Sequence, residues 1–137
     1  YVWRRAQGGA GRGPGTKGRM KMATNTNNLV KEIRKAPEAT IVSLGGDVDL
    51  HHSPALHAAL VEVAGERPRR LVLDMSGVPY IDSSGVGTFV EVFRRVTAYK
   101  GKMVFFGLND RVRSVFEITK LDKFFVICQS EEQATQA

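Results

Sequence analysis

The fold of this chain is decided by the stretch LVLDMSGVPYIDSSGVG, which occupies residues 71–87. Its first three residues are wholly apolar, which is typical of a short central strand covered on both faces. A loop follows, and Asp82 or Ser83 supplies an N-cap for a helix in which Glu91 and Arg95 are spaced to pair on the outer face. The buried face of this helix is predicted to consist of Val86, Phe89, Val90, Phe93 and Val96.

Upstream of this stretch, two strands are predicted to form an antiparallel hairpin. Residues 39–44 are rich in β-branched side chains and end at two glycines, and residues 29–34 form a weaker strand across a turn at residues 36–38. Ser53 is expected to cap a helix that has Pro54 in its first turn. The apolar face of that helix is predicted to contain Leu56, Ala59, Leu60 and Val63.

Downstream, strands and helices continue to alternate. Residues 102–106 are predicted to form a strand, Asn109 to cap a third helix, residues 124–128 to form a fifth strand and Ser130 to cap a short final helix. The order ββαβαβαβα predicts a single α/β domain. We expect a mixed sheet of about five strands, with an antiparallel N-terminal hairpin and a mostly parallel remainder, packed against about four helices.

Composition separates a short N-terminal segment from the rest of the chain. Residues 1–21 hold six basic and no acidic residues and six of the 14 glycines, so we expect a disordered extension outside the native fold and a domain over residues 22–137. An Arg/Gly tail for nucleic acid is the alternative. Residues 22–137 hold 14 basic and 14 acidic residues, which argues against direct nucleic-acid binding by the domain. No membrane-spanning run or leader is evident, so a cytoplasmic location is expected.

The strongest chemical signal is DSSGVG at residues 82–87. An N-cap is worth about 1 kcal/mol and explains one polar residue, but not two serines followed by two glycines. Glycine in a first turn costs about 0.5–1 kcal/mol relative to alanine, so Gly85 and Gly87 are predicted to bare the backbone for another molecule. The N–H groups and partial positive charge of a helix N-terminus tolerate phosphate. The pattern therefore favours a phosphate-acceptor site at Ser83, although a simple N-cap role is compatible with it.

The sequence YIDSSGVG at residues 80–87, preceded by LVLD at residues 71–74, resembles the signature of bacterial anti-sigma factor antagonists of the STAS domain family. Further landmarks agree in order along the chain, and the resemblance covers residues 28–134 but does not reach residues 1–21. These landmarks are GDVD at residues 46–49 before SPAL at residues 53–56, GKMV at residues 101–104 and LDKFF at residues 121–125.

The resemblance implies a phosphorylation switch that regulates a sigma factor. In that family the unmodified domain binds an anti-sigma factor, which is also a serine kinase of the histidine-kinase-like ATPase fold, and so frees a sigma factor. Phosphorylation of the first serine of the motif, here Ser83, ends the binding, and a PP2C-type phosphatase restores it. The surface that binds the partner is expected to include Asp49, Asp82, Ser84, Gly85 and Val86.

These positions also have ordinary structural explanations. Asp82 either orients the Ser83 hydroxyl or only shapes the turn, and Ser84 is a possible hydrogen-bond donor at the helix tip that is easily confused with the acceptor. Asp49 fits turn chemistry and partner contact equally well. The three histidines are predicted to be solvated surface residues rather than metal ligands, namely His51, His52 and His57.

No cofactor, metal or catalytic site is predicted. A serine hydrolase would need glycine two residues before its nucleophile, and Ile81 or Asp82 occupies that position. The GVG at residues 85–87 lacks the third glycine of a dinucleotide fingerprint. The alternatives that stay open are non-catalytic: a stressosome-like scaffold or an accessory subunit of a lipid-transport complex.

Overall fold

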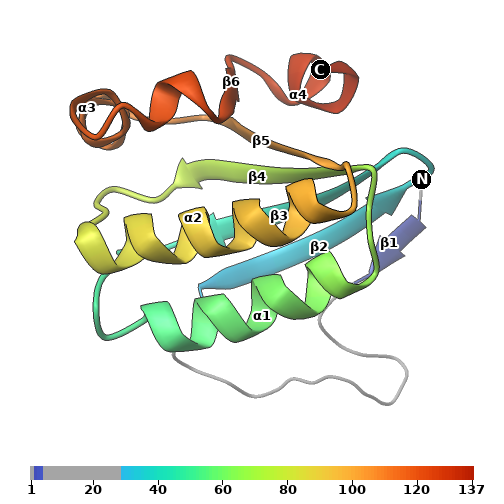
Figure 1. Ribbon diagram of the computed structural model, residues 1–137, viewed down its shortest axis with the longest axis horizontal. Helices are drawn as coiled ribbons and strands as arrows, with labels where there is room; N and C mark the ends of the chain where they lie inside the picture. The colour runs from blue at the N-terminus through green and yellow to red at the C-terminus, as the bar shows by residue number, and fades with distance from the viewer. Residues whose placement is uncertain (1, 5–28) are drawn as a thin grey trace.

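The computed structural model describes residues 2–4 and 29–137, which form a β-sheet flanked by helices (Figure 1). The strands lie side by side in chain order: β1 (Val2–Arg4), β2 (Val30–Ala36), β3 (Ala39–Gly45), β4 (Arg70–Gly77), β5 (Lys102–Phe106) and β6 (Val126–Cys128). The helices are α1 (Ser53–Gly65), α2 (Ser83–Ala98), α3 (Asp110–Ile118) and α4 (Glu131–Gln136), and a short 3-10 helix, η1 (Leu121–Lys123), follows α3.

The direction of each strand pair follows from the connection between its strands. A tight turn joins β2 to β3, which are antiparallel and place Ala36 opposite Ala39. Helical connections separate the strands from β3 to β6, and these strands are all parallel to one another. The predicted α/β fold, with an antiparallel hairpin leading into a parallel sheet, is therefore confirmed.

The sheet also has a strand that the sequence did not predict. β1 lies within residues 1–21, the segment expected to take no part in the fold, and pairs antiparallel with β2. It brings the sheet to six strands in place of about five. Residues 5–28 lie outside the described part of the chain, so the boundary near residue 22 stays a prediction. Across the described ranges, no helix is both long and apolar enough to cross a membrane.

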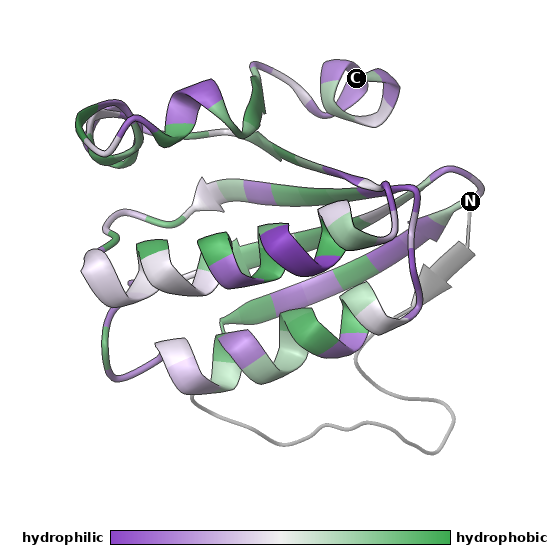
Figure 2. Ribbon diagram, in the orientation of Figure 1, coloured by the Kyte–Doolittle hydropathy of each residue, from purple (hydrophilic) through white to green (hydrophobic). Residues whose placement is uncertain are grey.

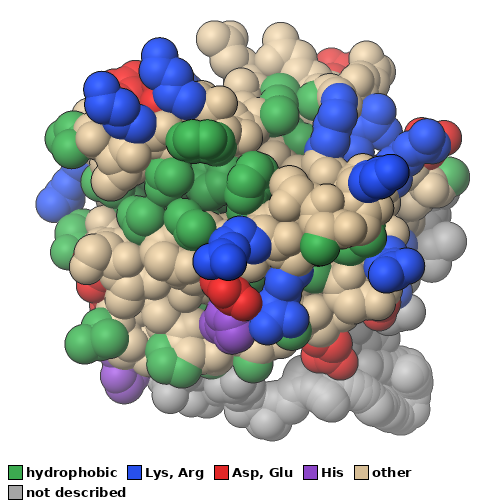
Figure 3. Space-filling model, viewed as in Figure 1, with side chains coloured by type: hydrophobic (Ala, Val, Ile, Leu, Met, Phe, Trp, Pro, Cys, Tyr) green, Lys and Arg blue, Asp and Glu red, His purple; other side chains and the backbone are tan. Residues whose placement is uncertain are grey.

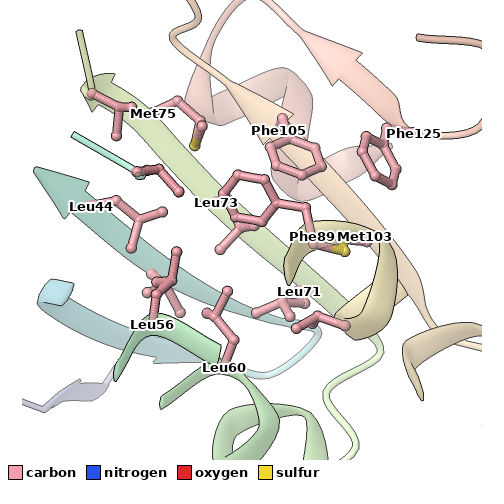
Figure 4. Close-up of a cluster of buried hydrophobic side chains, with 14 of the residues drawn as sticks. Leu44, Leu56, Leu60, Leu71, Leu73, Met75, Phe89, Met103, Phe105 and Phe125 are labelled. Atoms are coloured by element: carbon pink, nitrogen blue, oxygen red, sulfur yellow. The ribbon is translucent and has the colours of Figure 1, made fainter. Parts of the chain in front are cut away.

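The main core lies between one face of the sheet and helices α1, α2 and α3. Figure 4 shows side chains from α1, α2 and the strands gathered in this layer, with Leu56 and Leu60 coming from α1. Its aromatic part includes three fully buried rings: Phe105 lies 5.2 Å from both Phe89 and Phe116, centroid to centroid, and meets each edge to face. This core fixes α2 against β5.

A smaller core covers the opposite face of the sheet. Val72 and Val104 point away from the main core and pack with Ala134 of α4. Since both faces of the central strands are covered, these strands are hydrophobic along most of their length (Figure 2). Arg34 of β2 and Glu131 of α4 form a bidentate ion pair on this face, with Nη1–Oε2 and Nη2–Oε1 distances of 2.8 and 2.6 Å. The sheet is thus covered on both faces, as the wholly apolar strand at residues 71–73 predicted.

Helix α2 buries a different stripe from the predicted one. Phe89 and Val96 are buried as expected, whereas Val86, Val90 and Phe93 are only partly buried. The remaining buried positions are Gly85, Thr88 and Val92. The difference arises because α2 packs against α1 as well as β5, a contact that the periodicity of α2 alone does not specify. The predicted pair on its outer face is confirmed, with 3.0 Å between Arg95 Nε and Glu91 Oε2.

Four local predictions have mixed outcomes. Asn109 and Ser130 cap α3 and α4 through their side chains, as predicted. Ser53 is not the N-cap of α1: His52 occupies that position, although its side chain does not bond to the amides of the first turn, and the buried Ser53 is the first helical residue. The strand predicted over residues 124–128 begins only at Val126, because η1 and Phe124 precede it.

Candidate functional site

Two loops meet at the edge of the sheet where the parallel strands end. The loop at residues 46–52 follows β3, and the loop at residues 78–82 follows β4 and leads into α2. The N–H of Val48 donates to the carbonyl of Tyr80 at 2.9 Å, and the carbonyl of Val48 accepts from the N–H of Asp82 at 3.1 Å. These bonds hold the first loop beside the start of α2.

Asp82 organises the beginning of α2. It is the N-cap, and its Oδ1 accepts from the amides of Ser84 and Gly85 at 2.9 and 3.1 Å and from the Ser84 hydroxyl at 2.6 Å. Its Oδ2 accepts from the amide of Leu50 at 3.1 Å. Of the two roles considered for Asp82, the structure shows the one that shapes the turn, because these bonds bypass the Ser83 hydroxyl.

Ser83 is the first residue of α2, and its side chain is exposed. Among residues 29–137 no group forms a hydrogen bond with Ser83 Oγ. The interpretation of Ser83 as a simple N-cap is wrong, since Asp82 has that role. The Ser83 hydroxyl is thus accessible and unengaged at a helix N-terminus.

Ser84 differs from Ser83 in its surroundings. It is half-buried, and its hydroxyl donates to Asp82, which is the predicted donor role at the helix tip. Its Oγ also lies 3.1 Å from Oγ of Ser53, whose own hydroxyl donates to the carbonyl of Asp49 at 2.7 Å. The second serine of the motif is therefore part of an internal network that joins α2 to α1.

Asp49 lies at the same edge of the sheet, as its place between a strand and a helix suggested. Its Oδ1 accepts from the backbone N–H of His52 at 3.0 Å and lies 2.8 Å from His52 Nδ1. This pair was not predicted from the sequence, which favoured a solvated surface role for His52. In the described part of the chain, no three His, Cys, Asp or Glu side chains are placed to hold a metal.

The carboxylates of Asp82 and Asp49 are held in the ionised form. Burial raises the pKa of Asp82, but hydrogen bonds from the Ser84 hydroxyl and from neighbouring amides lower it by more, so the pKa lies below its ordinary value. Burial and the nearby charge of Asp82 raise the pKa of Asp49, and the bonds from His52 again outweigh them. Asp82 and Asp49 are therefore both negatively charged at neutral pH.

The two glycines of the motif have different surroundings. A Cβ on Gly85 would lie 2.6 Å from both Cγ1 and O of Val48, so the close approach that requires glycine here is intramolecular. This corrects the prediction that Gly85 bares the backbone for another molecule, because the residue is buried. A Cβ on Gly87 would meet nothing within 4 Å, and Gly87 is exposed.

Large apolar side chains surround the start of α2 at the surface. Leu50 is 74% exposed and Tyr80 is 38% exposed, while Val86 is partly buried. The Arg111 guanidinium lies over the Tyr80 ring at 5.6 Å from its centroid. Neither Leu50 nor Tyr80 was singled out from the sequence, because an apolar residue becomes informative only when its exposure is known.

Known proteins match this chain in sequence along most of its described length. The family model described as the STAS domain matches residues 30–134. The anti-sigma-B factor antagonist of Listeria monocytogenes is 33% identical over 101 residues, which cover 73% of this chain and 89% of that protein. The anti-sigma-B factor antagonist of Bacillus subtilis is 28% identical over 109 residues, which cover 80% of this chain and 99% of that protein.

Solved structures share the fold. An anti-sigma factor antagonist from Mycobacterium paratuberculosis superposes with a TM-score of 0.72 at 22% identity, over 83% of this chain and 97% of that one. The Bacillus cell fate determinant SpoIIAA, solved in its phosphorylated form, superposes with a TM-score of 0.60 at 21% identity, over 76% of this chain and 95% of that one. The arrangement of α2 and the sheet is thus that of these proteins.

Proposed function

Because this chain belongs to the STAS domain family, we propose that it is an anti-sigma factor antagonist whose phosphorylation site is Ser83. The unmodified protein binds an anti-sigma factor that is also a serine kinase of the ATPase fold, and so releases a sigma factor. It acts in the cytoplasm as a binding protein and not as an enzyme. The observation that carries the proposal is the exposed Ser83 hydroxyl, which has no hydrogen bond among residues 29–137.

The reaction at Ser83 is a phosphoryl transfer. A bond forms between Ser83 Oγ and the terminal phosphorus of ATP as the bond from that phosphorus to the ADP oxygen breaks. The hydroxyl proton passes to a base of the kinase, which also supplies the nucleotide and the catalytic groups. Because Ser83 is exposed at the end of a helix, the kinase reaches it without unfolding the domain.

Phosphorylation changes the charge of the site more than its shape. A phosphoserine adds about −1.5 to −2 charges beside the carboxylates of Asp82 and Asp49. Asp82 already occupies the amides of Ser84 and Gly85, so the new charge stays at the surface instead of replacing the cap. Like charge at a docking surface costs several kcal/mol, and about 2.8 kcal/mol already weakens binding a hundredfold.

The docking surface consists of the residues that border Ser83. Asp49, Asp82 and Ser84 shape it through their hydrogen bonds, and Val86 lies one turn further along α2. We add the exposed Leu50 to the residues predicted from the sequence. Gly85 contributes from inside, because it lets α2 approach Val48.

The phosphorylation site is tested with purified proteins. The chain is incubated with ATP and the ATPase-fold anti-sigma factor of its own genome, and phosphate is located by mass spectrometry. We expect one phosphate on Ser83 and none on a Ser83→Ala variant. The Ser84→Ala variant is the matched control and is expected to be phosphorylated, since Ser84 points into the internal network. Full phosphorylation of Ser83→Ala would contradict the proposal.

The switch itself is tested by titration calorimetry against the same anti-sigma factor. We expect Ser83→Asp to weaken binding by at least about tenfold through its charge, whereas Ser83→Asn, which has the same shape without the charge, retains most of the affinity. A PP2C-type phosphatase is expected to restore binding by the phosphorylated protein. Equal affinities for the Asp and Asn variants would show that charge at Ser83 does not control the contact.

A further inference from the structure

Part of the surface is apolar in a way that the core and Ser83 do not explain. Figure 3 shows hydrophobic side chains gathered in one area of the helical face, between α2 and α3, with Lys and Arg side chains around it. Helix α2 presents Val86, Val90 and Phe93 there, at helical spacing and only partly buried. We define the α2–η1 patch as Val86, Val90, Phe93, Leu121 and Phe124.

The two halves of the patch lie side by side. The Phe93 ring is 5.3 Å from the buried ring of Phe125, centroid to centroid, so α2 contacts the segment that follows η1. The amides of Phe124 and Phe125 donate to the carbonyl of Leu121 at 3.0 and 2.9 Å, which fixes Phe124 beside η1. The contact between Phe93 and Phe125 thus joins the two elements that border the apolar area seen in Figure 3.

Packing in the core does not explain why residue 124 is a large aromatic residue. Its side chain is 64% exposed and belongs to neither core, whereas the adjacent Phe125 is 4% exposed and fills the main core. A single exposed apolar residue is ordinary, but a gathered area of exposed apolar side chains is typical of a contact surface, and Figure 3 shows such an area between α2 and α3. Aromatic residues in such places contribute most to binding.

The charges around the patch are mostly positive. In the described part of the chain, Arg94, Lys120 and Lys123 form no ion pair. The charged residues of α2 and η1 nearest to the patch in sequence are Arg94, Arg95, Lys120 and Lys123 against Glu91 and Asp122. A partner that complements the patch therefore carries apolar side chains flanked by acidic ones.

We propose that the α2–η1 patch is a second contact for the anti-sigma factor, occupied by the apolar face of a helix that carries acidic side chains on its flanks. This inference rests on the proposed function. Val86 lies one turn from Ser83, so the patch continues the docking surface along α2. The apolar contact at the patch supplies affinity, and the charge on phosphorylated Ser83 decides whether the partner binds.

The proposal is tested by calorimetry with the anti-sigma factor and the unphosphorylated full chain. Phe124→Ser is expected to weaken binding by at least about tenfold, whereas Phe124→Leu, which stays apolar, is expected to remain within about threefold of the unaltered chain. A Lys120→Glu, Lys123→Glu double variant is expected to weaken binding. Lys102→Glu is the control for charge reversal. Lys102 is exposed at the start of β5, whereas Ser83 lies at the edge where the parallel strands end, so this variant is expected to leave the affinity unchanged.

The outcomes separate this inference from the proposed function. If Ser83→Asp weakens binding but Phe124→Ser does not, the inference is overturned and the proposed function stands. If the unaltered chain does not bind the anti-sigma factor, both fail. A dimer in sedimentation equilibrium that Phe124→Ser abolishes would assign the patch to a second copy and also overturn the inference. Melting curves show that each variant is folded, and Phe124→Ser is expected to melt as the unaltered chain does, because Phe124 is exposed.

Discussion

Replacing Gly85 by alanine tests whether the start of α2 is positioned by contact with Val48. The added Cβ would lie 2.6 Å from Cγ1 and O of Val48 and 2.8 Å from Cγ1 of Ile81. One of these atoms is backbone, so the loop or the helix must shift, which typically costs about 1–3 kcal/mol. Alanine recovers about 0.5–1 kcal/mol of helix propensity. The difference is a net loss of up to about 2.5 kcal/mol in the free energy of unfolding, against the gain expected for an alanine without contacts.

The matched control is Gly87→Ala in the same helix. Its Cβ meets nothing within 4 Å, so only the helix propensity changes and we expect a gain of about 0.5–1 kcal/mol. Both free energies come from urea unfolding followed by circular dichroism, compared at a common m-value. A Gly85→Ala protein as stable as Gly87→Ala would refute the argument, because it would show that the Val48 loop moves aside at no cost.

Three further predictions concern the network around α2 and the ion pair behind the sheet. The pKa of Asp82 lies below its ordinary 3.8 in the folded state, so its contribution to stability is complete above the ordinary pKa and is lost as pH falls through the folded value. Asp82→Asn keeps a cap, and its unfolding free energy is expected to fall less in acid, as urea titrations at stepped pH will show. Ser53→Ala is expected to lose about 1 kcal/mol, because the carbonyl of Asp49 loses a buried donor, and an unchanged urea midpoint would count against this. Arg34→Met leaves Glu131 without this bidentate partner, and we expect a loss of about 1–3 kcal/mol in the same assay.

The elements that could be predicted from the sequence are those fixed by local chemistry. The strand at residues 102–106 and the caps Asn109 and Ser130 agree with the structure, because each depends on residues close in sequence. The order of strands and helices then determines the parallel sheet. The exposure of Ser83 agrees with the prediction that its hydroxyl is a phosphate acceptor at a helix N-terminus.

The features that could not be predicted depend on contacts between distant segments. Asp82 reaches the amide of Leu50 only because two loops meet at the sheet edge, so its bond partners were not visible in the motif. Gly85 was assigned to an external contact because nothing in the sequence shows that Val48 lies against it. Phe124 was placed in a strand by its apolar neighbours, although only Phe125 points into the core. In each case the chemical character of the residue was recognised, but its neighbours in the folded protein were not.

The ion pair between Arg34 and Glu131 has a consequence for how the protein is made. The two residues are 97 positions apart, so a ribosome has to synthesise nearly the whole domain before β2 receives this partner from α4. Until then the small core behind β4 also lacks Ala134, and its valines face water. The nascent chain therefore completes its sheet late, and folding on the ribosome is expected to finish only when α4 has emerged.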